Sequence, residues 1–306
     1  MPAVSVQTAS ANGIEIAYEA FGSAGDPPVL LVMGLGTQML GWDDDFCEEL
    51  ADRGHHVVRF DNRDVGLSTH LHDAPTPDPE GAVGGDLSSA SYRLEDMAED
   101  AVGLLDALGL ESAHFVGVSM GGMIVQTVAI EHPDRIRSLV SIMSTTGNPQ
   151  VGVATPAAVQ ALLKPPSSSK EEMIDSTVET FRAIGSPGFA FDEERLRTRA
   201  ALSYDRAYDP AGFGRQLVGI FASGDRTPRL GAIDVPTLVI HGQEDPLVSF
   251  SGGEATAASI EGAELIAIDG MGHDLPREVW PRVIDGIVET VRRGEVAVPE
   301  GASQAS

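Results

Sequence analysis

The sequence predicts an α/β architecture in which a mostly parallel sheet is flanked by helices. Strand-like and helix-like segments alternate along most of its 306 residues, as they do in folds built from β–α–β units. The run Pro28 to Met33 is continuously apolar, which favours a central strand buried on both faces. Strand-like runs stop between about Gly147 and Arg229, where helical stretches broken by Pro-Pro and Ser-rich turns indicate a helical insertion.

The expected elements follow in chain order on either side of this insertion. The segment 14–20 alternates apolar and polar residues, which is typical of a half-buried edge strand. The segment 71–90 contains prolines and several glycines, so we expect an irregular loop there. Further strands are expected at 28–33, 55–60, 114–118, 136–143, 237–241 and 263–268. Helices are expected at 43–53, 94–108, 120–131, 253–259 and 278–292, and in the insertion near 171–184, 192–207 and 210–222.

These segments divide the chain into a core, an insertion and a tail. We expect one core built from residues 1–146 and 231–295, with a helical cap formed by residues 147–230. Residues 296–306 are small and polar, so we expect a flexible tail. A hydrophobic content of 42% is enough to form a sizeable core.

The charge balance limits the kinds of partner. The chain has 20 Lys and Arg residues against 46 Asp and Glu residues, a formal net charge of −26. Such a surface repels phosphate backbones and anionic headgroups, so we expect no nucleic-acid partner. No apolar run reaches the roughly 18 residues of a membrane span, and no signal peptide is visible. We therefore expect a cytoplasmic protein, a monomer or homodimer, with no stable membrane insertion.

The cysteine and histidine patterns give no metal site. Cys47 is the only cysteine, which excludes an intramolecular disulfide and a cysteine-based zinc site. We interpret it as a buried small residue on a helix. Seven of the eight histidines, all except His273, show no convincing metal spacing. We interpret His70 and His72 as part of a solvated loop and not as a set of metal ligands.

The segment Gly117-Val118-Ser119-Met120-Gly121 matches the G-x-S-x-G pattern of a nucleophile elbow. A strand-like segment precedes it and a helical one follows at once, so the turn would present the Ser119 hydroxyl above the sheet. The turn strains the backbone at the serine, and small neighbours at 117 and 121 supply the room it needs. A serine that only caps the helix is the structural alternative.

A base and an acid follow in the order Ser, Asp, His that this kind of site requires. His273 lies between glycines and Asp274 on a loop after the last expected strand, from which it can reach the serine. Asp245 follows the preceding strand, and its carboxylate would accept the Nδ1 hydrogen of His273. Glu244 is the neighbouring alternative for the acid, and a plain surface histidine is the alternative for the base.

Acyl transfer also needs N–H donors for the developing oxyanion. We expect one from the backbone of Met120, directly after the nucleophile. The other is expected from Leu35, because Gly34 and Gly36 on either side let its amide turn inward.

The substrate is expected to bind between the cap and the sheet. Gly34, Trp42, Phe213 and Phe221 are the expected contacts, with Trp42 near the entrance. Cap aromatics would supply an apolar wall, although each of them could equally belong to the core of the cap. They are Phe181, Phe189, Phe191, Tyr204, Phe213 and Phe221.

Together, the segments LLVMGLG, RFDNRDVGLS, GVSMGG, PTLVIHGQEDP and GMGHDLP make the chain resemble the α/β-hydrolase superfamily, and within it the esterase branch of aclacinomycin methylesterase and mycobacterial lipase/esterase-like proteins. The resemblance covers about residues 12–146 and 231–293. It implies an eight-stranded-type sheet, a helical cap, no cofactor and no metal, and it assigns Ser119, Asp245, His273, Leu35 and Met120 the same roles.

The resemblance has one departure and one shared turn of note. Met33 stands where many relatives have a histidine that supports the oxyanion loop, although the esterase branch also has methionine there. The segment 61–68 resembles the family turn D-x-R-G-x-G-x-S, and we interpret it as mainly structural, packing beneath the site.

The expected function is that of a serine carboxylic ester hydrolase acting on a small to medium, partly apolar ester through an acyl-serine. The same residues would also serve a thioesterase or phospholipase, a carbon–carbon bond hydrolase, or a cofactor-free perhydrolase or haloperoxidase. From a different class, a non-catalytic ligand-binding relative is the remaining alternative.

Overall fold

The computed structural model describes residues 5–297 and is built around one eight-stranded sheet with the strand order β1-β2-β4-β3-β5-β6-β7-β8. The first two pairings, β1 with β2 and β2 with β4, are antiparallel, and all the others are parallel. The strands are β1 (Gln7–Ala11), β2 (Ile14–Phe21), β3 (Pro28–Val32), β4 (His56–Phe60), β5 (Ala113–Val118), β6 (Ile136–Ile142), β7 (Thr237–Gly242) and β8 (Glu264–Ile268). The predicted fold class, a mostly parallel α/β sheet, is confirmed.

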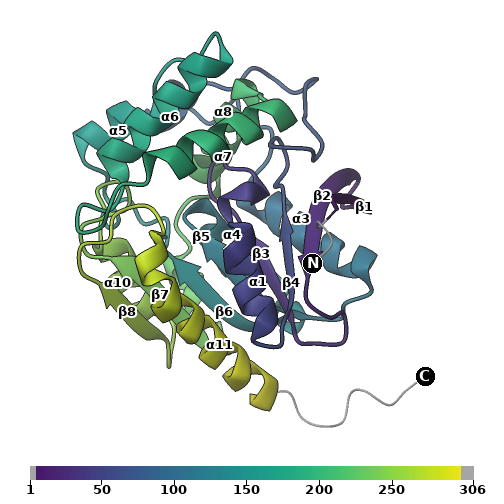
Figure 1. Cartoon of the computed structure of the whole chain (residues 1–306). Coiled ribbons are helices and arrows are strands. Elements are labelled where there is room, and N and C mark those ends of the chain that lie inside the picture. The colour runs from purple at the N-terminus through teal and green to yellow at the C-terminus, as the bar shows by residue number, and fades with distance from the viewer. Residues whose placement is uncertain (1–4, 298–306) are drawn as a thin grey trace.

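Helices cover both faces of this sheet (Figure 1). One buried cluster joins the sheet to α3 (Leu94–Leu108) and α4 (Met120–Glu131), and a second joins it to α1 (Asp44–Asp52) and α11 (Trp280–Ala297). α10 (Ser251–Ser259) packs beside β7 and β8. β3 and β5 are buried along their whole length because they lie between these two helical layers.

A helical segment is inserted between β6 and β7. It comprises α5 (Pro156–Leu162), α6 (Lys170–Ile184), α7 (Glu193–Arg206), α8 (Pro210–Ser223) and α9 (Thr227–Leu230). Figure 1 shows α5 to α8 stacked together at one end of the sheet, with α1 and α11 extending away from them. The insertion that the loss of strand patterns predicted is therefore a helical layer over one edge of the core.

Buried ion pairs connect the predicted turn at 61–68 to this helical layer. Asp61 is fully buried and accepts a hydrogen bond from the Arg206 guanidinium at the end of α7, with 2.9 Å between Nη2 and Oδ2. Asp64 is also fully buried and pairs with Arg215 of α8 at 2.7 Å. A buried carboxylate needs such a partner, so each pair fixes the inserted helices to the core.

The structure corrects three of the expectations about strands, loops and helices. The strand at 14–20 is not an edge strand, because β1 pairs with its outer side from Gln7 to Ala11. The loop at 71–90 contains a short helix, α2 (Pro79–Val83), which Asp78 caps by accepting from the Gly81 amide. The last helix runs to Ala297, so the tail expected from residue 296 loses its first two residues to α11, and 298–306 lie outside the described residues.

Three short 3₁₀ turns complete the described elements: η1 (Met39–Gly41), η2 (Pro133–Arg135) and η3 (Arg277–Val279). Among residues 5–297, none of the helices combines the length and the apolar character that crossing a bilayer requires. Cys47 is fully buried on α1, as predicted, and burial raises the pKa of its thiol to about 12. A thiol that stays protonated behaves as a small apolar side chain.

Candidate active site

Ser119 stands at a strained turn between β5 and α4. Its backbone lies at φ 55° and ψ −119°, a conformation that L-residues adopt only when their surroundings impose it. A Cβ at position 117 would lie 2.2 Å from the carbonyl oxygen of Gly121, and one at position 121 would lie 2.2 Å from that of Val32. Both positions therefore require glycine, which is the physical basis of the G-x-S-x-G pattern.

The structure brings Ser119, His273 and Asp245 together from three distant parts of the chain. His273 Nε2 lies 3.0 Å from Ser119 Oγ, and His273 Nδ1 lies 2.7 Å from Asp245 Oδ2. A carboxylate can only accept, so Nδ1 carries the hydrogen and Nε2 is left free to accept from the serine hydroxyl. Both His273 and Asp245 are buried, which shields this chain of hydrogen bonds from water.

Asp245 is fixed in place by its other oxygen. Its Oδ1 accepts from the backbone amides of Leu247 and Val248, at 2.9 and 2.8 Å. Glu244, the alternative acid, points elsewhere and accepts from the Gly270 amide at 2.5 Å. The geometry thus selects Asp245 as the partner of His273, while Glu244 holds the loop that carries the histidine.

The loop carrying His273 is bound to the helical insertion, a feature that the sequence did not reveal. The His273 amide donates to the carbonyl of Ile184 at 2.8 Å, and the Gly188 amide donates to the carbonyl of Gly270 at 2.9 Å. Between these two bonds, the Ser186 hydroxyl accepts from the Gly272 amide at 2.9 Å. We call residues 184–188 the cap strip; it positions the imidazole through the backbone.

The loop after β3 lies beside Ser119. A Cβ on Gly34 would be 3.2 Å from the Ser119 Cβ, so only glycine leaves the serine uncrowded. The Gly36 amide donates to Gln216 of α8 at 2.8 Å, whereas the Leu35 amide makes no hydrogen bond within residues 5–297. Leu35 and Met120, the first residue of α4, therefore remain the candidate oxyanion donors.

Asn62 supports this loop in a way the sequence analysis missed. Its side-chain amide donates to the carbonyl of Met33 at 2.9 Å, and Asn62 is itself buried. Met33 is the residue that replaces the supporting histidine of many relatives. The support for the loop therefore comes from the side chain of Asn62, in the turn at 61–68, and a contact between positions 29 residues apart has no local sequence signal.

A cavity of about 1130 Å³ lies between the core and the inserted helices, and Ser119 and His273 line it. Three of the expected substrate contacts, Gly34, Phe213 and Phe221, line it as well. The other predicted aromatic residues in its wall are Phe181, Phe191 and Tyr204. The apolar wall that the sequence predicted is therefore largely present.

One of the four predicted substrate contacts, Trp42, is wrong, and one of the cap aromatics, Phe189, is absent from the cavity wall. Trp42 does not line the cavity, because its ring is buried in the core, 5.3 Å from the ring of Phe46, which in turn packs on Trp280. Phe189 packs against the same core cluster instead of facing the cavity. Trp42 is large and apolar, and its place in the core removes more of its surface from water than a position at the entrance would.

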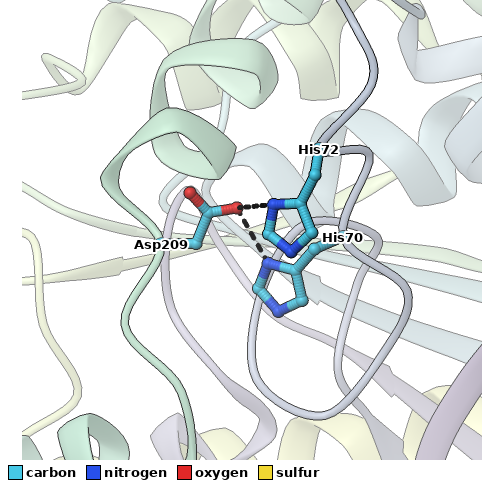
Figure 2. A group of neighbouring side chains, drawn as sticks. All are labelled: His70, His72 and Asp209. Carbon is cyan, nitrogen blue, oxygen red and sulfur yellow. Dashed lines mark hydrogen bonds and ion pairs between the residues drawn. The ribbon is translucent and has the colours of Figure 1, made fainter.

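His70, His72 and Asp209 form a polar group at the junction of the loop and α8, which Figure 2 shows. His70 Nδ1 lies 2.9 Å from Asp209 Oδ2, and His70 Nε2 lies 3.0 Å from the carbonyl of Gly66. The same Asp209 oxygen accepts from Arg215 at 3.0 Å. A metal ion here would have to displace these bonds and lie against a guanidinium, so the group serves as a bridge between core and insertion.

Comparisons with known proteins agree with this architecture. The family model for the alpha/beta hydrolase fold matches residues 27–276. Rhodomycin D methylesterase DauP of Streptomyces sp. (strain C5) is 30% identical over 300 residues, which cover 91% of this chain and 95% of the relative. 3-oxoadipate enol-lactonase 2 of Acinetobacter baylyi is 28% identical over 248 residues, covering 81% and 82%.

A solved structure gives the same result. The enol-lactonase from Burkholderia xenovorans LB400 superposes with a TM-score of 0.72 at 26% identity, covering 94% of this chain and all of that one. The resemblance read from the sequence, including its link to methylesterases, is confirmed. With the sheet order, the elbow and the inserted helices, these matches show that the chain is a hydrolase and belongs to the α/β-hydrolase family.

Proposed function

We propose that this protein is a serine carboxylic ester hydrolase in which Ser119 is the nucleophile, His273 the general base and Asp245 the orienting acid. The observation that carries the proposal is the continuous line of hydrogen bonds from Asp245 through His273 to Ser119, at 2.7 and 3.0 Å. Relatives named as a methylesterase and an enol-lactonase support ester cleavage as the reaction. The core of 1–146 and 231–295 carries the chemistry, and the cap of 147–230 selects the substrate.

In the proposed first step, His273 Nε2 takes the hydroxyl proton of Ser119 as Oγ bonds to the ester carbonyl carbon. The carbonyl oxygen becomes an oxyanion, which the amides of Leu35 and Met120 bind. The positive end of α4 adds to this stabilisation because the helix begins directly after the nucleophile. Asp245 stabilises the imidazolium that forms.

The intermediate then expels the alcohol, which receives the proton from His273, and an acyl-serine remains. Water enters, gives a proton to the same nitrogen and attacks the acyl carbon. Release of the acid returns the proton to Ser119 Oγ. The cavity of about 1130 Å³ is slightly larger than the roughly 300–1,000 Å³ of sites that bind drug-sized ligands, so it has room for a small to medium, partly apolar ester.

The test compares Ser119→Ala with Ser176→Ala, a serine that lines the same cavity from α6. We expect the first variant to lose turnover of p-nitrophenyl esters and labelling by a fluorophosphonate probe, and the second to keep both. Turnover by Ser119→Ala at more than a few per cent of the parent rate would refute the nucleophile. Acyl-CoA thioesters, and peroxide with acetate, assayed in parallel, separate the ester hydrolase from a thioesterase and a perhydrolase.

A further inference from the structure

One face of α7 lines the cavity along almost the whole helix. Arg195, Arg199 and Ser203 are spaced four residues apart, so they lie in one row on the helix surface, and all three line the cavity. The row places two guanidinium groups beside the space that the substrate would occupy. The two guanidinium groups differ in whether an acidic side chain pairs with them, and this difference indicates what the cavity can bind.

The other lysine and arginine side chains of the cavity wall are paired with acids. Arg195 Nε lies 3.0 Å from Asp43 Oδ1, and its Nη2 bonds the second oxygen of the same carboxylate. Arg277 pairs with Asp45 at 2.7 Å. Lys164, which also lines the cavity, pairs with Glu179 at 2.8 Å. Arg199 differs from them because it forms neither an ion pair nor a hydrogen bond with any residue of 5–297.

The acids nearest to Arg199 already have other partners. Asp43 is held by Arg195, and Asp274 accepts from the Ser186 hydroxyl of the cap strip. Burial raises the pKa of Asp274, which weakens it further as a counter-charge, and burial lowers the pKa of the Arg199 guanidinium. The Arg199 guanidinium is half-buried and has no acidic partner of its own, so an anion that enters the cavity would gain a charge-assisted hydrogen bond there.

The position of the guanidinium is fixed by an aromatic neighbour. Its central carbon lies 5.8 Å from the ring centroid of Phe181 on α6, within the range of a cation–π contact. The N–H groups of Arg199 stay available, because they make no hydrogen bond with any of residues 5–297. A planar fork of N–H donors matches the two oxygens of a carboxylate.

We propose that Arg199 binds a carboxylate on the substrate, so the preferred substrate is an ester that also carries a free carboxylate. This inference rests on the proposed function, and it names the substrate class of the same site. One unpaired guanidinium balances one negative charge, which favours a carboxylate over the dianion of a phosphate monoester. The net charge of −26 also makes any more anionic ligand costly to bring in.

The test uses matched pairs of p-nitrophenyl esters. In each pair, the acyl chain of one ester ends in a free carboxylate (adipate, pimelate and suberate monoesters), and that of the other ends in an isosteric isopropyl group. The measured quantity is the ratio of kcat/KM for the carboxylate ester to that for its neutral partner. In Arg199→Gln we expect this ratio to fall by at least about tenfold for the best chain length, because a charge-assisted hydrogen bond is lost. The ratio for Arg199→Lys should lie between those of the parent protein and Arg199→Gln, because lysine keeps the positive charge but lacks the planar fork of donors.

Arg197→Gln is the matched control, because Arg197 lies on the same helix, does not line the cavity and pairs with Glu193 and Asp175. It should leave the ratio unchanged. A second readout, competitive inhibition by the free dicarboxylates, should weaken in Arg199→Gln by a similar factor. An equal ratio in the parent protein and in Arg199→Gln, for every chain length, would overturn the proposal.

These outcomes are separable from failure of the proposed function. If Ser119 were not the nucleophile, the Ser119→Ala variant would still cleave both esters of a pair. If only the role of Arg199 were wrong, cleavage would depend on Ser119, but the ratio of kcat/KM values would be the same in the parent protein and in Arg199→Gln. Circular dichroism of Arg199→Gln checks its fold, and if it does not fold, the Arg199→Lys variant carries the comparison.

Discussion

Exchanging Asp245 for asparagine tests whether catalysis depends on the direction of the hydrogen bond between Asp245 and His273, within the triad of Ser119, His273 and Asp245. The two oxygens of Asp245 are not equivalent, because Oδ1 accepts from the amides of Leu247 and Val248 while Oδ2 accepts from His273. In Asp245→Asn, the side-chain carbonyl must stay with the two backbone amides. The new NH₂ group then faces His273 Nδ1 and donates to it.

The consequence is a change of tautomer with little change of shape. With Nδ1 accepting, the ring hydrogen moves to Nε2, 3.0 Å from Ser119 Oγ, where it can no longer take the serine proton. The loss in kcat should be about 10⁴-fold, the cost that a wrong tautomer has in triads of this type. That factor corresponds to about 5 kcal/mol in the activation free energy. The free energy of unfolding should change much less, because both backbone amides keep their acceptor.

The assay is steady-state cleavage of a p-nitrophenyl ester, with urea unfolding measured on the same samples. Glu244→Gln is the matched control, since glutamine can still accept from the Gly270 amide and is one residue away. We expect its kcat to stay within about threefold of the parent value. A kcat for Asp245→Asn within tenfold of the parent, or a larger loss in Glu244→Gln, would refute the assignment of the acid.

Three further predictions concern stability. Burial lowers the pKa of His114 from 6.5 to about 4, so as the pH falls the imidazole is protonated in the unfolded chain before it is protonated in the folded protein. The free energy of unfolding should therefore fall by up to about 3 kcal/mol between about pH 6.5 and about pH 4. Urea unfolding measured across this range should show that His114→Gln removes this part of the pH dependence. Arg206→Met leaves the buried Asp61 carboxylate with only amide partners and should destabilise by about 3 kcal/mol, so a cost below 1 kcal/mol in urea unfolding would count against the ion pair. Gly121→Ala should destabilise by about 2 kcal/mol or more in thermal melts, whereas Gly25→Ala, with its nearest neighbour at 3.9 Å, should not.

The sequence was sufficient for the fold class and for the three side chains that meet at the nucleophile. Both are encoded locally: the strand 28–33 is apolar at every position, and Ser119 and His273 have glycine neighbours that mark tight turns. The order of the three residues then followed from the order of the strands. Such signals survive in a single sequence because each of them depends on only a few adjacent residues.

Features that depend on contacts between distant segments could not be read in this way. β1 was missed because an edge strand exposed on most of its surface has little apolar pattern. Trp42 was misplaced because an aromatic residue suits a core and a pocket equally, and only the packing of α1 on α11 decides between them. The bond from Asn62 to Met33 joins positions 29 residues apart, and no local pattern specifies it.

The cap strip means that the loop carrying His273 and the inserted helices are not independent modules. Because the carbonyl of Ile184 receives the His273 amide, a cap that swung away as a rigid lid would take an anchor of the imidazole with it. The imidazole therefore keeps its position only while the cap strip stays bound to the loop that carries His273. Grafting a foreign cap onto this core would transfer new specificity only if the graft recreates the contact at 184–188.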